Sequence, residues 1–202
     1  MKRRAYVSSV RSAAAAEKRD RVIEAAAKSL REDTSIARFS LDTVAKAAGV
    51  TRLTVYNQFG SRRGLLEAVF DDIARQGGLH EIADAMAMPE PLRALDRVVE
   101  IFCGFWARDA AIGRLHEAMA TDPEFAEALL DRNERRRKLV RMLVGRIAGK
   151  AASRRAREGA IDMIFALTSY PMFAMLSRGR ATNEVCQLVQ SACRAAVEPL
   201  SR

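Results

Sequence analysis

One short run of side chains has the chemistry needed to recognise the edges of DNA bases: Thr51, Arg52, Leu53 and Thr54. An arginine such as Arg52 can donate two hydrogen bonds to one guanine, which is the commonest base-specific contact in protein–DNA complexes. Leu53 and the methyl group of Thr54 can contact the methyl group of a thymine. The run therefore predicts base recognition in the major groove of duplex DNA.

A second set of side chains, around this run, can donate hydrogen bonds to phosphate oxygens. Such contacts fix the position of a protein on DNA without reading the base sequence. The set consists of hydroxyl, amide and guanidinium groups: Ser40, Thr43, Tyr56, Asn57 and Arg62. The two sets together predict one DNA-binding surface.

Two short helices are predicted to hold these side chains in place. Residues 41–48 carry apolar side chains at spacings i, i+3, i+4 and i+7, and Ser40 before them can cap the free amides of a helix. Gly49 suits the left-handed residue that ends such a helix. Thr51 follows almost at once and can cap a second helix, which Gly60 ends. Two helices joined by a tight turn that contains glycine form a helix-turn-helix.

The whole sequence predicts an all-α fold with two domains. Residues 1–63 form an N-terminal arm and a three-helix DNA-binding domain, whose helix-turn-helix motif spans about residues 40–59. Residues 64–202 form a helical domain for effector binding and dimerisation. Apolar stripes and helix start signals predict the remaining helices over about 22–30, 61–76, 91–106, 112–119, 122–149, 154–177 and 183–197, with Asp122 as a cap and Pro171 as a kink.

The positive charge is concentrated at one end of the chain. Residues 1–63 contain 14 Lys and Arg against 6 Asp and Glu, a net charge of +8. The other 139 residues contain 20 against 19, a net charge of +1. A basic end on a neutral body favours contact between that end and a polyanion such as DNA. A solubilising tail would explain the charge alone equally well.

The sequence gives little support to an enzyme or a carrier built on the helical body. It lacks the patterns of a nucleophile with its base, a metal cluster or a phosphate-binding loop, and it has only two histidines, His80 and His116. Cys103, Cys186 and Cys193 share no metal-ligand spacing and suit a protein core. We therefore predict no enzyme activity, no metal and no cofactor.

Two further runs predict, respectively, a buried helix and a solvated helix face. The longest uncharged run, residues 163–177, is shorter than the roughly 20 residues that cross a bilayer and predicts a buried helix. Arg11 and Glu17 interrupt any apolar stretch behind the basic residues at the N-terminus, so we expect no export signal and a cytoplasmic protein with no membrane partner. The basic run over residues 132–141 predicts a solvated helix face paired with Asp131 and Glu134, with a second nucleic-acid patch as the alternative.

The helix-turn-helix region resembles the TetR family of repressors. The signature of that family is a capped second helix, a turn of sequence A-G-V-[ST], a short helix ending in Y-x-x-F, and a serine with a basic residue leading into a long helix. Residues 48–66 of this chain read AGVTRLTVYNQFGSRRGLL. The resemblance covers about residues 21–70, and the rest of the chain is similar to the family only in length and number of helices.

This resemblance implies a function and a set of contacts. It implies a homodimeric transcriptional regulator, specifically a repressor that a small-molecule effector releases from operator DNA. Base contacts are implied for Arg52 and Thr54, and phosphate contacts for Thr51, Tyr56 and Arg62. The residues leave one alternative open, namely a DNA-binding regulator or architectural protein that has no small-molecule effector and is controlled by a protein partner.

The resemblance also implies a dimer interface and an effector pocket in the C-terminal domain. The last two long helices would pair with those of a second subunit, and residues 163–177 have more apolar surface than one helix face needs. A monomeric core is the alternative for that run. The residues that could line an effector pocket are mostly aromatic residues and methionines, and plain core packing would equally explain such a set. The candidates to line a pocket for a small apolar or amphipathic effector are Phe102, Phe105, Trp106, His116, Met119, Met142 and Phe165, with Met86 and Met88 as further candidates.

Overall fold

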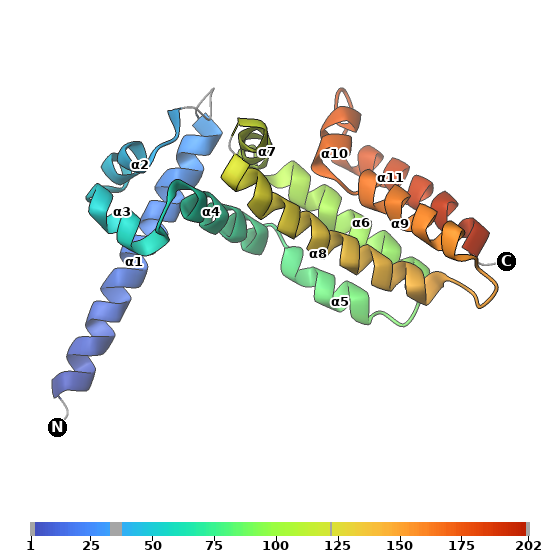
Figure 1. Ribbon diagram of the computed structural model, residues 1–202, viewed down its shortest axis with the longest axis horizontal. Helices are drawn as coiled ribbons and strands as arrows, with labels where there is room; N and C mark the ends of the chain where they lie inside the picture. The colour runs from blue at the N-terminus through green and yellow to red at the C-terminus, as the bar shows by residue number, and fades with distance from the viewer. Residues whose placement is uncertain (1–2, 33–37, 122, 201–202) are drawn as a thin grey trace. The chain divides into compact units, whose positions relative to one another are not determined.

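The computed structural model describes residues 3–32, 38–121 and 123–200 (Figure 1). In these residues it contains α-helices and short 3-10 helices, and no strand, which confirms the predicted all-α class. The cap predicted at Asp122 lies outside the described residues. In chain order the elements are α1 (Arg3–Glu32), α2 (Leu41–Ala48), α3 (Arg52–Phe59), α4 (Arg62–Gln76), η2 (Leu79–Glu81), α5 (Ile82–Ala87), α6 (Pro91–Arg108), α7 (Ala111–Thr121), α8 (Pro123–Ile147), α9 (Arg154–Leu167), α10 (Tyr170–Leu176), α11 (Thr182–Val197) and η3 (Glu198–Leu200).

Contacts between residues divide the chain into two units. The first unit contains residues 1–73 and 110–126, and the second contains residues 74–109 and 127–202. This division differs from the boundary predicted between residues 63 and 64. The contacts assign α4 to the first unit as far as Ile73, and with it the fully buried side chains Leu65, Leu66 and Val69. The helix that follows the helix-turn-helix is thus part of the first unit's core rather than the start of the next domain.

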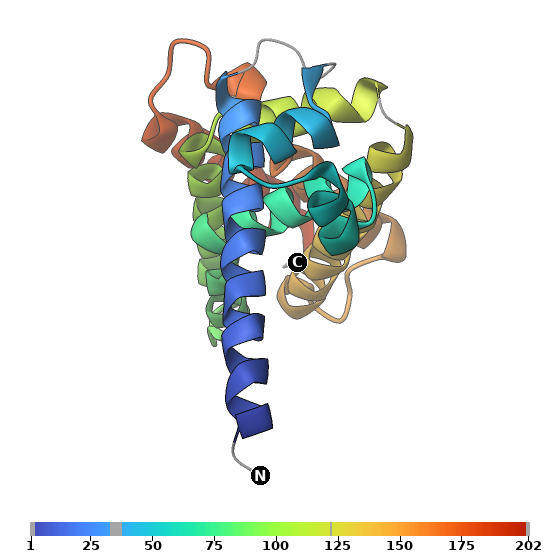
Figure 2. The same cartoon turned by 90° about the vertical axis from the view of Figure 1, so that its left-hand side faces the viewer.

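In the first unit, α2, α3 and α7 all contact α1, and Figure 2 shows α2 and α3 beside that long helix. The buried side of α1 carries Val22, Ala26 and Leu30 at helical spacing. This confirms the amphipathic stripe predicted over residues 22–30. The helix itself begins well before that stripe, at Arg3.

In the second unit, α11 packs against both α6 and α9 (Figure 1). The core of this unit joins buried side chains from α6, α8, α9 and α11. The sequence predicts a stripe on the last helix that includes Leu188, but the buried residues of α11 are Val185, Val189, Cys193 and Val197, each four apart. Leu188 lies outside this stripe and is exposed.

The helix predicted over residues 154–177 is in fact two helices. α9 ends at Leu167 and α10 begins at Tyr170, with a bend of 60° between them. The hydroxyl of Ser169 caps α10 by accepting a hydrogen bond from the Met172 amide. Pro171 stands in the first turn of α10, where a helix does not need the N–H that proline lacks. Pro171 therefore helps to start a new helix instead of kinking a continuous one.

The described part of the chain contains neither a single membrane-spanning helix nor a metal-binding cluster. No single helix there is long and apolar enough to cross a membrane, although the bent pair α9 and α10 passes that test by length and composition. No group of three or more His, Cys, Asp and Glu side chains within residues 3–32, 38–121 and 123–200 could hold a metal ion.

Candidate nucleic-acid interface

α2 starts at a capping box formed by Ser40 and Thr43. The Thr43 amide donates a hydrogen bond to the Ser40 hydroxyl over 3.1 Å, and the Ser40 amide donates one to the Thr43 hydroxyl over 3.0 Å. Each bond satisfies an amide that has no partner inside the helix. The cap predicted at Ser40 is confirmed. The two hydroxyls predicted to contact phosphate also hold the start of the helix in place.

A tight turn places α3 directly after α2. Gly49 has φ 66°, the left-handed conformation that favours glycine, and its amide donates to the carbonyl of Lys46 over 3.3 Å. Thr51 then caps α3, because its hydroxyl accepts a hydrogen bond from the Thr54 amide over 3.1 Å. The turn and the second cap predicted from the sequence are both confirmed. They fix the start of α3, which carries the predicted base-reading side chains.

α3 has one buried side and one exposed side. Val55 is fully buried and anchors the helix, whereas Leu53 is 65% and Tyr56 is 56% exposed. Arg52 and Asn57 are exposed as well. One side of a short helix therefore presents a guanidinium, an apolar group, a phenol and an amide. These are the groups that contact base edges and phosphates in protein–DNA complexes.

Arg52 has an acidic neighbour on α2. Its Nη1 lies 3.4 Å from Oδ2 of Asp42, and both side chains are mostly exposed. An exposed ion pair of this kind contributes little free energy. Asp42 thus holds the guanidinium of Arg52 only weakly near the start of α3.

Arg62 has a structural contact that the sequence does not predict. Its Nε donates a hydrogen bond to the carbonyl of Phe39 over 3.0 Å, and its guanidinium lies 5.7 Å from the centre of the Phe39 ring. The contact fastens the start of α4 to the segment just before α2. In the same unit, the guanidinium of Arg19 lies 4.5 Å from the centre of the Phe59 ring and joins α1 to the end of α3. If Arg62 also contacts a phosphate, the same side chain must serve both that contact and the hydrogen bond to Phe39.

Comparison with known proteins identifies the region that contains these helices. Residues 23–69 match the model of the family described as bacterial regulatory proteins, tetR family. This DNA-binding region, residues 23–69, belongs to the TetR family. The HTH-type transcriptional regulator EthR of Mycolicibacterium smegmatis is 33% identical over 112 residues, which are 54% of this chain and 51% of the relative. The matched part thus spans about half the length of that relative.

Solved structures of this family extend the likeness of fold to nearly the whole chain. SCO4454, a TetR-family transcriptional regulator from Streptomyces coelicolor, aligns with a TM-score of 0.70 at 18% identity and covers 93% of this chain and 97% of its own. A transcriptional regulator from Saccharomonospora viridis in complex with choline aligns with a TM-score of 0.65 at 14% identity, covering 87% and 95%. The TetR family consists of regulators and not enzymes, in agreement with the prediction that this chain has no enzyme activity.

The three cysteines of the chain pack as core residues. Cys103 on α6 and Cys193 on α11 are buried, and Cys186 is half-buried. Burial raises the pKa of the Cys193 thiol to about 12, and a hydrogen bond with Cys186 raises the pKa of Cys103. A thiol with a raised pKa is a poor nucleophile at neutral pH.

The residues predicted to line an effector pocket fall into both units. Phe102, Phe105 and Trp106 on α6 form an aromatic cluster, with ring centres 6.1 Å apart for Phe102 and Trp106 and 4.7 Å for Phe105 and Trp106. Phe165 on α9 belongs to the same unit. Met142 is 58% exposed on α8, so it does not line the interior of this unit, contrary to the prediction. His116 and Met119 lie on α7 in the first unit, and the side chain of Met119 is outside the described part of the structure.

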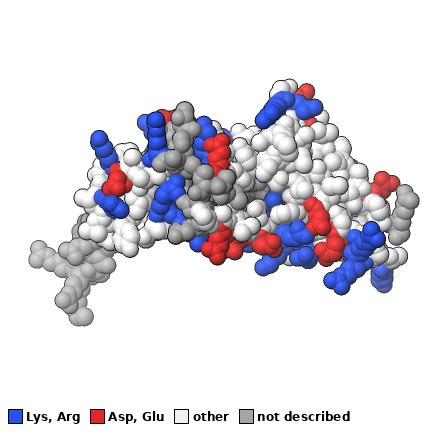
Figure 3. Space-filling model, turned by 45° about the horizontal axis from the view of Figure 1, so that its top comes forward, with Lys and Arg blue, Asp and Glu red and all other residues white. Residues whose placement is uncertain are grey.

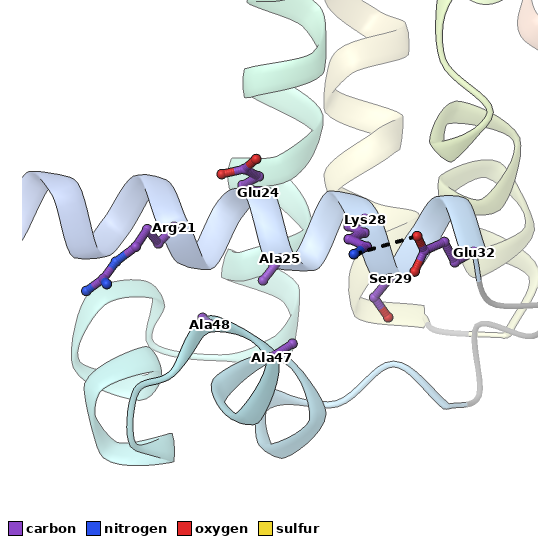
Figure 4. Close-up of a pocket in the computed structure, with 8 residues that line it drawn as sticks. All are labelled: Arg21, Glu24, Ala25, Lys28, Ser29, Glu32, Ala47 and Ala48. Carbon is purple, nitrogen blue, oxygen red and sulfur yellow. Dashed lines mark ion pairs between the residues drawn. The ribbon is translucent and has the colours of Figure 1, made fainter.

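One hollow of about 490 Å³ lies in the first unit between α1 and α2 (Figure 4). Small side chains, Ala25, Ala47 and Ala48, line it together with charged residues of α1. Lys28 and Glu32 at its edge form an ion pair of 3.9 Å. It contains none of the residues predicted to line an effector pocket, and its charged rim resembles an ordinary helix–helix groove.

The basic run over residues 132–141 is exposed at Arg135, Lys138 and Arg141, as predicted for a solvated face, but its ion pairs are not the predicted ones. Arg137 forms an ion pair with Asp162 on α9, and Arg141 lies 3.6 Å from Glu158 on the same helix, in place of the predicted partners Asp131 and Glu134. Figure 3 shows Lys and Arg side chains interspersed with Asp and Glu over the face in view, in line with such pairs. The run therefore joins α8 to α9.

Arg136, in the middle of this run, is a residue that sequence reasoning missed. It is half-buried, and burial lowers the pKa of its guanidinium to about 10. A signal for its position was present, because Leu129, Arg136, Val140 and Leu143 follow one helical stripe and the other three are buried. An arginine inside an apolar stripe faces the interior of a unit rather than the solvent.

Proposed function

We propose that this chain is a transcriptional regulator that binds operator DNA with α3 in the major groove. The observation that carries the proposal is the exposed side of α3, where Arg52, Leu53 and Tyr56 project beside a capped tight turn. Membership of residues 23–69 in the TetR family and the net charge of +8 in residues 1–63 support it. The recognition helix of a helix-turn-helix contacts base edges with its N-terminal residues. In this chain the N-terminal residues of α3 are Arg52, Leu53 and Thr54. The regulator is proposed to bind operator DNA in the cytoplasm.

Two copies of the chain are proposed to bind one operator as a homodimer through α9, α10 and α11. Each of these helices exposes one large apolar side chain: Met163 is 54%, Met175 is 58% and Leu188 is 46% exposed. A second copy would remove this apolar surface from water. A two-fold dimer would set two α3 helices against half-sites one helical turn, roughly 34 Å, or somewhat more apart.

The regulator is proposed to be a repressor that leaves its operator when a small molecule binds in the second unit. α4 and α8 each contain residues of both units, so a ligand held in the second unit acts on helices that continue into the DNA-binding unit. Such a ligand must prefer one conformation of the protein over another. The choline complex of the Saccharomonospora viridis regulator supports the idea that this fold can hold a small molecule.

Replacing Arg52 by alanine is expected to relax sequence discrimination at one base position by about 1–3 kcal/mol, because one bidentate contact to guanine is lost. Tyr56→Phe is expected to weaken binding to all duplexes alike, because a phosphate contact carries no sequence information. Fluorescence anisotropy with the DNA upstream of the gene, and with single-base variants of it, measures both effects. The affinities are taken over a range of salt, since the logarithm of the affinity falls linearly with the logarithm of the salt concentration.

Arg135→Ala is the matched control for Arg52→Ala. It removes the same charge from an exposed position on α8 in the second unit. The control is expected to keep the discrimination of the wild type at every base position. If the wild-type protein binds all duplexes with equal affinity, the proposed function is wrong.

A further inference from the structure

We propose that the small molecule bound by the second unit is an organic acid, whose carboxylate pairs with Arg136 and whose apolar or aromatic body packs on Phe165, Phe102 and Trp106. The proposal deepens the proposed function, since it names the chemical class of the effector and the residue that selects it. It narrows the small apolar or amphipathic ligand expected from the sequence to one that carries an acidic group.

Arg137 and Arg141 on α8 each pair with a carboxylate of α9, whereas the partly buried Arg136 pairs with none of the described ones. Arg137 pairs with Asp162 and Arg141 pairs with Glu158. The guanidinium of Arg136 instead donates to neutral oxygens, to the Thr168 hydroxyl over 3.3 Å and to the Asn133 side-chain carbonyl over 3.4 Å. Among the side chains that the structure describes, no carboxylate forms an ion pair with it. Within the described residues, the guanidinium of Arg136 is thus a partly buried positive charge without a counter-charge.

Such a charge favours the binding of an anion. Removing a guanidinium from water is unfavourable unless a partner compensates for the lost hydration. The guanidinium stays protonated at neutral pH even though burial lowers its pKa to about 10. Its two present hydrogen bonds are long, so a ligand could displace their acceptors easily. A carboxylate matches the planar fork of the guanidinium with two parallel, charge-assisted bonds.

The aromatic rings beside Arg136 indicate that the rest of the ligand is apolar or aromatic. The guanidinium carbon lies 4.3 Å from the centre of the Phe165 ring and 6.0 Å from that of Phe102. Trp106 stacks on Phe102, and its Nε1 donates a hydrogen bond to the carbonyl of Thr168 over 3.0 Å. The hydroxyl of the same Thr168 accepts the hydrogen bond from Arg136. These rings offer an apolar wall to a ligand whose carboxylate is held by the guanidinium. They do not favour a cation such as choline, because Arg136 already places a positive charge over their faces.

Trp106 allows the proposal to be tested without DNA. It is the only tryptophan of the chain, so the intrinsic tryptophan fluorescence of the protein reports on the surroundings of Arg136 alone. The probes are phenylacetate, benzoate and octanoate, compared with the matching neutral amides and with choline. We expect saturable fluorescence changes with at least one of the acids, and affinities for its amide and for choline about tenfold to a hundredfold lower, as expected for the loss of a hydrogen-bonded charge pair.

Substitution of Arg136 separates a binding role from a purely structural one. Arg136→Gln is expected to lower the affinity for the acid about tenfold to a hundredfold and to remove the preference for acid over amide. Arg136→Lys keeps the charge but loses the fork, so it should keep part of that preference even if the glutamine variant folds poorly. Arg135→Gln, one residue away and exposed, is the matched control and should bind as the wild type does.

Three results would overturn the inference: no saturable binding of any of the acids up to their solubility limits, equal affinity for acid and amide, or unchanged binding by Arg136→Gln. Anisotropy measurements on operator DNA with the same protein samples keep this inference apart from the proposed function. Specific DNA binding without any acid binding refutes the effector class and leaves the regulator in place. Acid binding that depends on Arg136, with no preference for any DNA, supports the ligand site and refutes the regulator.

Discussion

Gly64→Ala is expected to remove about 1–3 kcal/mol or more of the free energy of unfolding and to abolish most of the operator affinity. A Cβ at residue 64 would lie 2.1 Å from the carbonyl oxygen of Phe59 and 3.2 Å from its carbonyl carbon. Both are backbone atoms at the end of α3, so no side-chain rotation can relieve the overlap. Either α3 or the first turn of α4 must move, and the side chains that read bases would move with α3.

Urea unfolding followed by circular dichroism measures the stability of this variant, and anisotropy measures its operator affinity. Gly104→Ala on α6 and Gly145→Ala on α8 are matched controls, because a Cβ at either position would have no heavy atom within 4 Å. Each control is expected to be neutral or to stabilise the protein by about 0.5–1 kcal/mol, since alanine favours a helix interior over glycine. A Gly64→Ala protein that unfolds at the urea concentration of the wild type would contradict the prediction.

The helix-turn-helix could be predicted from the sequence because its signals are local. The caps at Ser40 and Thr51 each act on an amide three residues away, and Gly49 ends α2 through its own backbone conformation. Such signals depend on a few neighbouring residues, so a single sequence contains all the information they need. The exposed side of α3 followed from the same reasoning, because Val55 marks the buried side.

Contacts between distant residues could not be predicted in the same way. Arg62 bonds to Phe39 across 23 residues, and Arg136 bonds to Thr168 across 32 residues. Periodicity shows which side of a helix is buried but not which helix covers that side. The pairing of Arg137 with Asp162 shows the same limit, since Glu134, three residues away on the same helix, satisfies the spacing rule for an ion pair equally well. The division of residues 154–177 into two helices depends on Ser169, whose role as a cap appears only once the chain turns there.

Combining Met163→Glu with Leu188→Glu is expected to convert the dimer into monomers and to lower the operator affinity about 10²- to 10⁴-fold, which is the usual gain from linking two binding events. The two side chains are the large exposed apolar groups of α9 and α11. In a two-fold interface each substitution occurs twice, so four carboxylates would be brought together and removed from water. One α3 helix would then bind one half-site alone, without the second half-site that gives the dimer its affinity.

Light scattering after size-exclusion chromatography decides this prediction, because the mass should fall from twice 22.3 kDa to 22.3 kDa. Met142→Glu is the matched control, since Met142 is as exposed as Met163 but lies on α8, outside the proposed interface. The control should remain a dimer and keep its operator affinity. A double variant that remains a dimer would place the interface elsewhere, whereas a monomer with full operator affinity would show that α3 binds DNA without a second copy. The two measurements together therefore test whether the exposed apolar side chains of α9 and α11 serve DNA binding through dimerisation.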